Sequence, residues 1–113
     1  MMTCDEVRCI LKNMMHNISE AREKIHKANE WKDKHRGIAD WFRQMAVGHL
    51  EYNTGAMQMV KNGLHEIRNE HAHSTDPEQM QYMHGKCEAY EEWLNQIGPD
   101  TAEVRAMIDG YGK

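Results

Sequence analysis

Between Val7 and Ala28 the apolar residues recur at alternating steps of four and three, and this pattern most constrains how the chain can fold. The series consists of Val7, Leu11, Met14, Ile18, Ala21, Ile25 and Ala28. Residues spaced in this way share one face of an α-helix, as in a coiled coil. Thr3 is a suitable N-cap, and Gly37 is a suitable stop after a group of basic residues. The sequence therefore predicts a first helix over residues 3–35.

A second helix is predicted over residues 38–73. Its apolar stripe, with His49 near the centre, consists of Ile38, Phe42, Met45, His49, Ala56, Val60, Gly63 and Ile67. Glycines at positions 48, 55 and 63 interrupt this helix, and each costs about 1 kcal/mol relative to alanine. Either the helix breaks near Gly55, or the glycines let another backbone come close. We favour the second interpretation, because Gly48, Tyr52, Gly55 and Met59 follow one flank of the stripe.

The clearest boundary in the sequence is Asp76-Pro77, which suits the N-cap and first position of a third helix over residues 77–97. Gly98-Pro99 is expected to end that helix, and a capping box at residues 100–103 is expected to start a short fourth helix over residues 101–109. The chain has little material for strands. We therefore predict a single all-α domain over residues 1–113, built on a long antiparallel helical hairpin.

The expected helix lengths indicate self-association. A hairpin of about 33 and 36 residues would be about 50 Å long, whereas a third helix of about 21 residues would span only about 32 Å. Part of the apolar stripe would then lack an intrachain partner, and exposed stripes of this kind usually mark interfaces. We expect a homodimer that completes a helical bundle. The expected interface residues are Trp41, Gly48, His49, Tyr52, Gly55 and Met59.

Composition excludes several classes of function. The net charge is −4 with histidine neutral, so the chain lacks the basic footprint of a nucleic-acid-binding protein. Cys4, Cys9 and Cys87 form neither an even disulfide framework nor a Cys-x-x-Cys pair. The sequence shows no apolar run typical of a signal peptide or membrane span, and we expect a cytoplasmic protein with reduced thiols. No nucleophile is paired with a fixed histidine and acid, and we expect a non-enzymatic protein.

Two Glu-x-x-His pairs provide candidate metal ligands. Glu23 and His26 point away from the apolar face of the first helix, which favours a solvated surface. Glu66, Glu70 and His73 would share one face at the end of the second helix, and carboxylates with imidazoles suit Fe, Mn or Zn. The alternative is a helix end where histidines meet the C-terminal dipole. For His49 we favour a structural hydrogen bond over a ligand role, either in the core, to Asn29, Asn53 or Tyr52, or to its mate across a two-fold axis.

The stretch Ala28-Asn29-Glu30-Trp31-Lys32-Asp33-Lys34, followed by Ala39-Asp40-Trp41-Phe42, Met45 and His49, resembles small ferritin-like helical proteins, including phage-encoded ones. The resemblance covers residues 18–70. It implies a helical hairpin, self-association and an iron-type centre with a glutamate three residues before a histidine. Ala46 stands at that position before His49, so the fold is carried over and the ferroxidase activity is not.

Two functions are therefore expected. The first is a self-associating helical protein that binds a protein partner. Phage origin would suit an inhibitor or regulator of a host protein. The alternative is a ferritin-like metal-binding protein that uses Glu66, Glu70 and His73.

Overall fold

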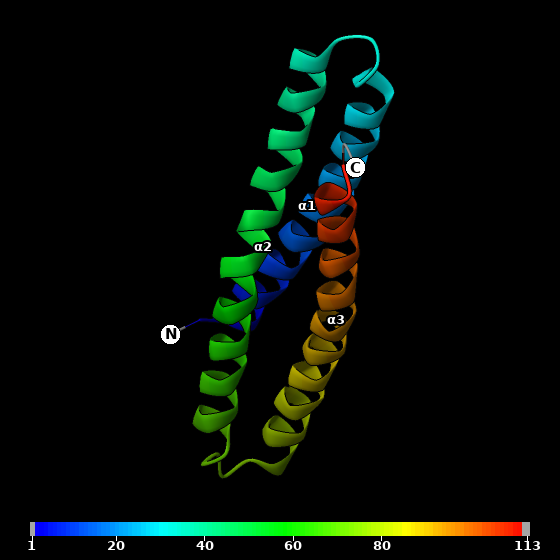
Figure 1. Cartoon of the computed structure of the whole chain (residues 1–113). Coiled ribbons are helices and arrows are strands. Elements are labelled where there is room, and N and C mark those ends of the chain that lie inside the picture. The colour runs from blue at the N-terminus through cyan, green and yellow to red at the C-terminus, as the bar shows by residue number, and fades with distance from the viewer. Residues whose placement is uncertain (1, 112–113) are drawn as a thin grey trace.

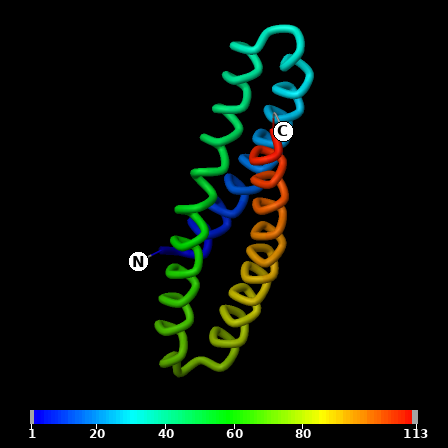
Figure 2. Tube along the Cα trace, viewed as in Figure 1, coloured from blue at the N-terminus to red at the C-terminus, as the bar shows by residue number. Residues whose placement is uncertain are grey.

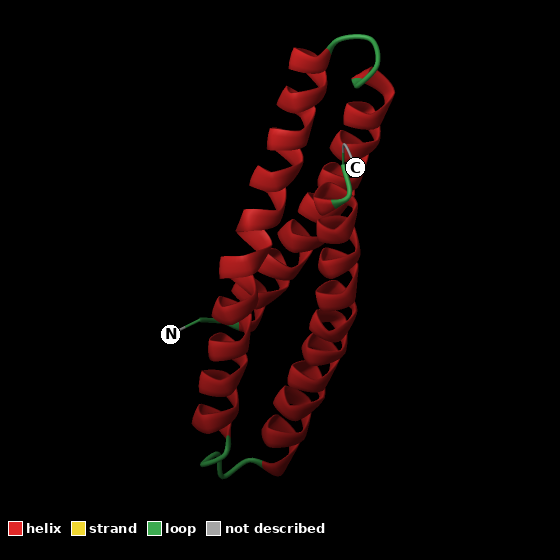
Figure 3. Ribbon diagram, in the orientation of Figure 1, coloured by secondary structure: helices red, strands yellow, loops and turns green. Residues whose placement is uncertain are grey.

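The computed structural model describes residues 2–111, and three long helices make up most of them (Figures 1 and 3). Helix α1 spans Cys4–Trp31, α2 spans Arg36–His71 and α3 spans Pro77–Asp109. The Cα trace turns back after α1 and again after α2, so consecutive helices run antiparallel (Figure 2). The all-α prediction and the helical hairpin are confirmed.

The three helices are staggered along one axis. The side chain of Met2, just before α1, lies against Gly63, so α1 leaves the last two turns of α2 uncovered. At the other end, the Tyr111 ring lies 6.0 Å from the guanidinium of Arg43, so α3 stops short of the α1–α2 turn. The described chain measures 64 × 20 × 15 Å, with a radius of gyration of 18.0 Å; a compact chain of this length would have about 13 Å. Each end of the rod therefore contains only two helices (Figure 1).

Helix α1 confirms the predicted seam and corrects its end. All seven residues of the series from Val7 to Ala28 are buried. Thr3 and Glu6 form a reciprocal capping box, in which the Glu6 amide donates to the Thr3 hydroxyl at 3.2 Å. The helix ends at Trp31 and not at residue 35, because His35 already caps α2 by accepting from the Ile38 amide at 3.2 Å. Gly37, predicted to stop the first helix, lies inside α2.

Helix α2 is continuous through Gly48, Gly55 and Gly63, the glycines expected to interrupt it, but its first half is rotated relative to the prediction. The residues that face the core there are Ala39, Ala46, Leu50 and Asn53, whereas Ile38, Phe42, Met45 and His49 are only half-buried. The physical reason is size: two alanines on the inner face allow the neighbouring helices to come close, and the larger side chains fill the edges of the contact.

Helix α3 contradicts the predicted stop at Gly98-Pro99, since residues 101–109 continue the same helix. The buried positions Leu94, Ile97, Thr101, Val104 and Ile108 keep one heptad face across the proline. A proline inside a helix costs about 3 kcal/mol, whereas burying Val104 and Ile108 contributes about 1.5–3 kcal/mol for each side chain. Tertiary burial therefore outweighs the local break, and the uncovered surface arises from stagger and not from a short third helix.

One buried polar group joins the three helices in their zone of overlap. The Asn53 side chain is 0% exposed, and its amide nitrogen donates to the Met14 carbonyl at 3.1 Å and to the Thr101 hydroxyl at 3.3 Å. A buried amide must keep these partners, because an unpaired one costs about 1–3 kcal/mol. The contact between Asn53 and Thr101 thereby favours one alignment of α3 on α2, and Thr101 serves that contact and not the predicted capping box.

Replacing Pro99 by alanine tests the continuity of α3. We expect Pro99→Ala to raise the free energy of unfolding by about 1–3 kcal/mol, because it restores a helical hydrogen bond inside a continuous helix. The measurement is urea unfolding followed by circular dichroism. Pro77→Ala is the matched control: Pro77 occupies the first turn, where its missing N–H has no helical partner, so little change is expected. Equal effects at the two prolines would contradict a continuous α3.

Candidate interaction surfaces

The outer face of α2 carries five of the six predicted interface residues. Gly48, Tyr52, Gly55 and Met59 are all exposed and follow one line along the helix, with Trp41 on the same line nearer its N-terminus. At 100° per residue, this line lies roughly 130° around the helix from the face that meets the core. We call these five residues the outer seam.

The outer seam combines large apolar side chains with open backbone. The exposed fractions are 57% for Trp41, 41% for Tyr52 and 52% for Met59. A methyl group added at Gly48 or Gly55 would meet no atom within 4 Å in the described part of the chain. The close backbone approach predicted at these two glycines is therefore not made within this chain, and another molecule would have to make it.

Charge is scarce along the same stretch. Charged residues make up 28% of the whole chain, yet Glu51 is the only Asp, Glu, Lys or Arg between residues 44 and 60. An exposed helix face normally carries many charges, and depletion of charge is typical of the centre of an interface. The exposed side of α2 thus has the composition of a contact surface.

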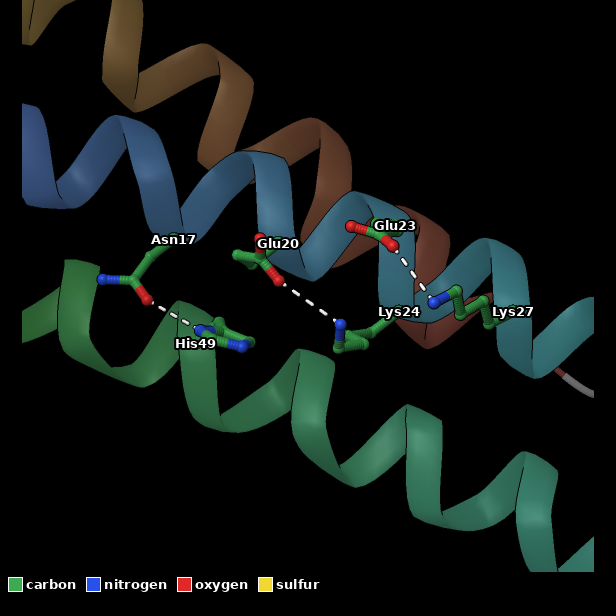
Figure 4. A network of polar contacts seen from close by, with 6 residues as sticks. All are labelled: Asn17, Glu20, Glu23, Lys24, Lys27 and His49. Carbon is green, nitrogen blue, oxygen red and sulfur yellow. Dashed lines mark hydrogen bonds and ion pairs between the residues drawn. The ribbon is translucent and has the colours of Figure 1, made fainter.

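His49, the sixth predicted interface residue, is engaged inside the chain. Its Nδ1 lies 2.7 Å from the side-chain oxygen of Asn17 on α1, and the ring is half-buried (Figure 4). The hydrogen-bond partner is none of the three residues proposed from the sequence. Asn17 directly precedes the buried Ile18, and this position beside the α1 seam was the signal that could have identified it.

Ion pairs on α1 continue the edge that His49 and Asn17 form. Lys24 contacts Glu20 at 3.3 Å, and Lys27 contacts Glu23 at 3.1 Å (Figure 4). The hydrogen bond and charge of Lys27 lower the pKa of the exposed Glu23 carboxyl. Glu23 is therefore part of a surface ion pair, as the solvated interpretation of the first Glu-x-x-His pair expects.

The predicted metal ligands at the end of α2 do not converge. Helix α2 ends at His71, so His73 is beyond the helix and does not share its face with Glu66 and Glu70. Glu66 borders one hollow, together with Met59, whereas Glu70 borders a second hollow, together with His71. Among residues 2–111, no group of three or more His, Cys, Asp or Glu is placed to hold a metal ion.

The end of the rod that α1 does not reach contains an open groove of about 710 Å³ between α2 and α3. Its apolar lining includes Ile67, Met80, Met83 and Cys87, and histidines 71 and 84 also border it. An ion pair between Arg68 and Glu91, at 2.6 Å, links the two helices beside it. We call this feature the end groove. The sequence did not indicate this groove, because the groove depends on where α1 begins relative to α2.

Cys87 is the least exposed of the three free cysteines. Its side chain is 1% exposed, and burial raises the pKa of its thiol. A higher pKa leaves less of the reactive thiolate at a given pH.

Alkylation tests this placement. With iodoacetamide at pH 8 and mass-spectrometric readout, we expect the exposed Cys9 to react roughly tenfold or more faster than Cys87. Unfolding the protein in urea should bring the two rates together. Equal rates in the native protein would contradict the buried position of Cys87.

Comparisons with known proteins identify no relative. No family model matches the chain, and no match is found among curated proteins or solved structures. None of the helices within residues 2–111 is long and apolar enough to cross a membrane.

Proposed function

We propose that this chain is a non-enzymatic helical protein that self-associates and acts by binding another protein. The observation that carries the proposal is the outer seam of α2: the large apolar side chains of Trp41, Tyr52 and Met59 are exposed, and Glu51 is the only charged residue between residues 44 and 60. Exposed apolar surface of this kind marks a site of protein contact, because its burial releases ordered water and lowers the free energy.

The chain has a second surface that suits a protein partner. The end groove is apolar and open. Met80 and Met83 line it, and methionine side chains adapt to differently shaped ligands. A groove between two helices accepts an amphipathic helix that inserts its apolar side chains. We assign self-association to the outer seam and partner binding to the end groove. The nature of the partner, including a host protein inhibited by a phage, rests on the sequence resemblance alone.

Charge substitutions in the outer seam test self-association. We expect the native protein to sediment as a dimer at tens of micromolar, and Tyr52→Glu with Met59→Glu to sediment as a monomer. An unpaired charge buried in an interface costs about 3–5 kcal/mol, which corresponds to a loss of affinity of more than a hundredfold. Circular dichroism should show unchanged helicity, since both side chains are exposed.

Tyr82→Glu is the matched control, because Tyr82 is an exposed tyrosine on α3, with an exposed fraction of 57% against 41% for Tyr52. This variant should remain dimeric. A native protein that is monomeric at these concentrations would refute self-association, and an unchanged dimer in the double variant would exclude the outer seam as its site.

Metal analysis separates this proposal from the alternative of a metal-binding protein. If Glu66, Glu70 and His73 hold Fe, Mn or Zn, with ligands completed by another chain, native protein should contain stoichiometric metal that Glu70→Ala removes. We expect substoichiometric metal in both proteins by plasma mass spectrometry. Stoichiometric metal that depends on Glu70 would favour the alternative.

A further inference from the structure

We propose that two copies of this chain pair through α2 in an antiparallel, two-fold symmetric register whose axis passes between Asn53 and Thr54. This inference rests on the proposed self-association and specifies its geometry. Helix α2 spans Arg36–His71, so its midpoint falls between these two residues. In an antiparallel pair with that axis, residues at equal distances from the midpoint face each other.

The outer seam is self-complementary in this register. Gly48 faces Met59 of the second copy, and Tyr52 faces Gly55 of the second copy. Both contacts place a large side chain opposite a glycine whose neighbourhood is open within its own chain. Large residues that insert opposite small ones are the basis of close helix packing, and a two-fold axis makes each contact twice. We call the open spaces beside Gly48 and Gly55 the sockets. In this register the side chains of Met59 and Tyr52 of the second copy fill them.

The parallel alternative lacks this fit. Equivalent residues would meet, so glycine would face glycine, and tyrosine would face tyrosine. The interface would contain voids where two glycines meet and would be overfilled where two large side chains meet. Both defects weaken packing. A parallel pair would also align the two helix dipoles, whereas the antiparallel pair brings each N-terminus beside the C-terminus of its mate. Shape and electrostatics thus favour the same orientation.

The outer layers of the antiparallel pair are also compatible. Trp41 faces Glu66 of the second copy, and the indole N–H can donate to a carboxylate. Glu51, the one charge near the centre, lies beside the neutral Gln58 of the second copy, so like charges do not meet. Because both helices have the same length and midpoint, the register pairs them along their full extent.

The contact area reaches what a specific dimer needs. A 36-residue helix is about 54 Å long, and a strip about 10 Å wide along it covers about 500 Å² on each copy. The total of about 1,000 Å² meets the lower bound for a biological interface. The same side of α2 borders the edge of α1 at His49 and Asn17, so this edge of each α1 lies beside the interface.

Disulfide cross-linking tests the register. Gly48→Cys and Met59→Cys are made separately in a background with Cys4→Ser and Cys9→Ser, which retains the buried Cys87. Each variant alone should stay uncross-linked under mild oxidation, because two copies of position 48, or of position 59, are about 16 Å apart in the antiparallel pair. An equal mixture of the two variants should form a 48–59 disulfide, identified by mass spectrometry.

The outcomes of this experiment separate the two proposals. A dimer in which Gly48→Cys cross-links to itself would establish the parallel orientation and overturn the register. A dimer without a 48–59 disulfide would also overturn the register, while self-association would stand. A monomer by sedimentation would overturn both.

Filling the sockets provides a second measurement. Gly48→Leu with Gly55→Leu should weaken dimerisation at least tenfold while the denaturation midpoint of the dilute monomer rises, because leucine favours helix and finds open space in the chain. Gly85→Leu is the matched control, since Gly85 on α3 is equally open. Undiminished dimerisation of the double variant would overturn the assignment of the glycines as sockets.

Discussion

The buried seam of α1 is the contact on which the rest of the structure depends. Its seven residues are enclosed by α2 and α3, so α1 is the element around which the other two helices are arranged. Most helical stability in proteins comes from the packing of such a face and not from intrinsic propensity. This explains why α2 tolerates four glycines and α3 tolerates an internal proline: both helices are held by the core that they share with α1.

The three helices are staggered along the rod, and this stagger leaves apolar surface exposed at its ends. Three helices of comparable length would bury nearly all their apolar faces if their ends were level. Here α1 starts beside Gly63 and α3 ends near Arg43, so two-helix ends remain and the end groove opens at one of them. The contact of Asn53 with Thr101 favours this alignment of α3, because sliding α3 by one turn would put an apolar side chain in place of the Thr101 hydroxyl.

The outer face of α2 has a different origin. Its glycines and its scarcity of charge are properties of the sequence, and no side chain among residues 2–111 fills the space beside Gly48 or Gly55. A helix that served only as a scaffold would be more stable with alanine and charged residues at these positions. The glycines reduce the stability of the monomer by a known mechanism, and an antiparallel partner offers a physical reason for their presence.

The sequence by itself determined the class of fold, the buried face of α1 and the N-caps at Thr3 and Asp76, because these follow from local spacing and local hydrogen bonds. It also identified the outer seam, since glycine, tyrosine and methionine spacing is visible without coordinates. Only the tertiary structure decided that α3 passes through Pro99, that the first half of α2 is rotated and that His49 bonds to Asn17. These features depend on the free energy of burial between helices that are distant in sequence. Local sequence patterns carry no information about those contacts.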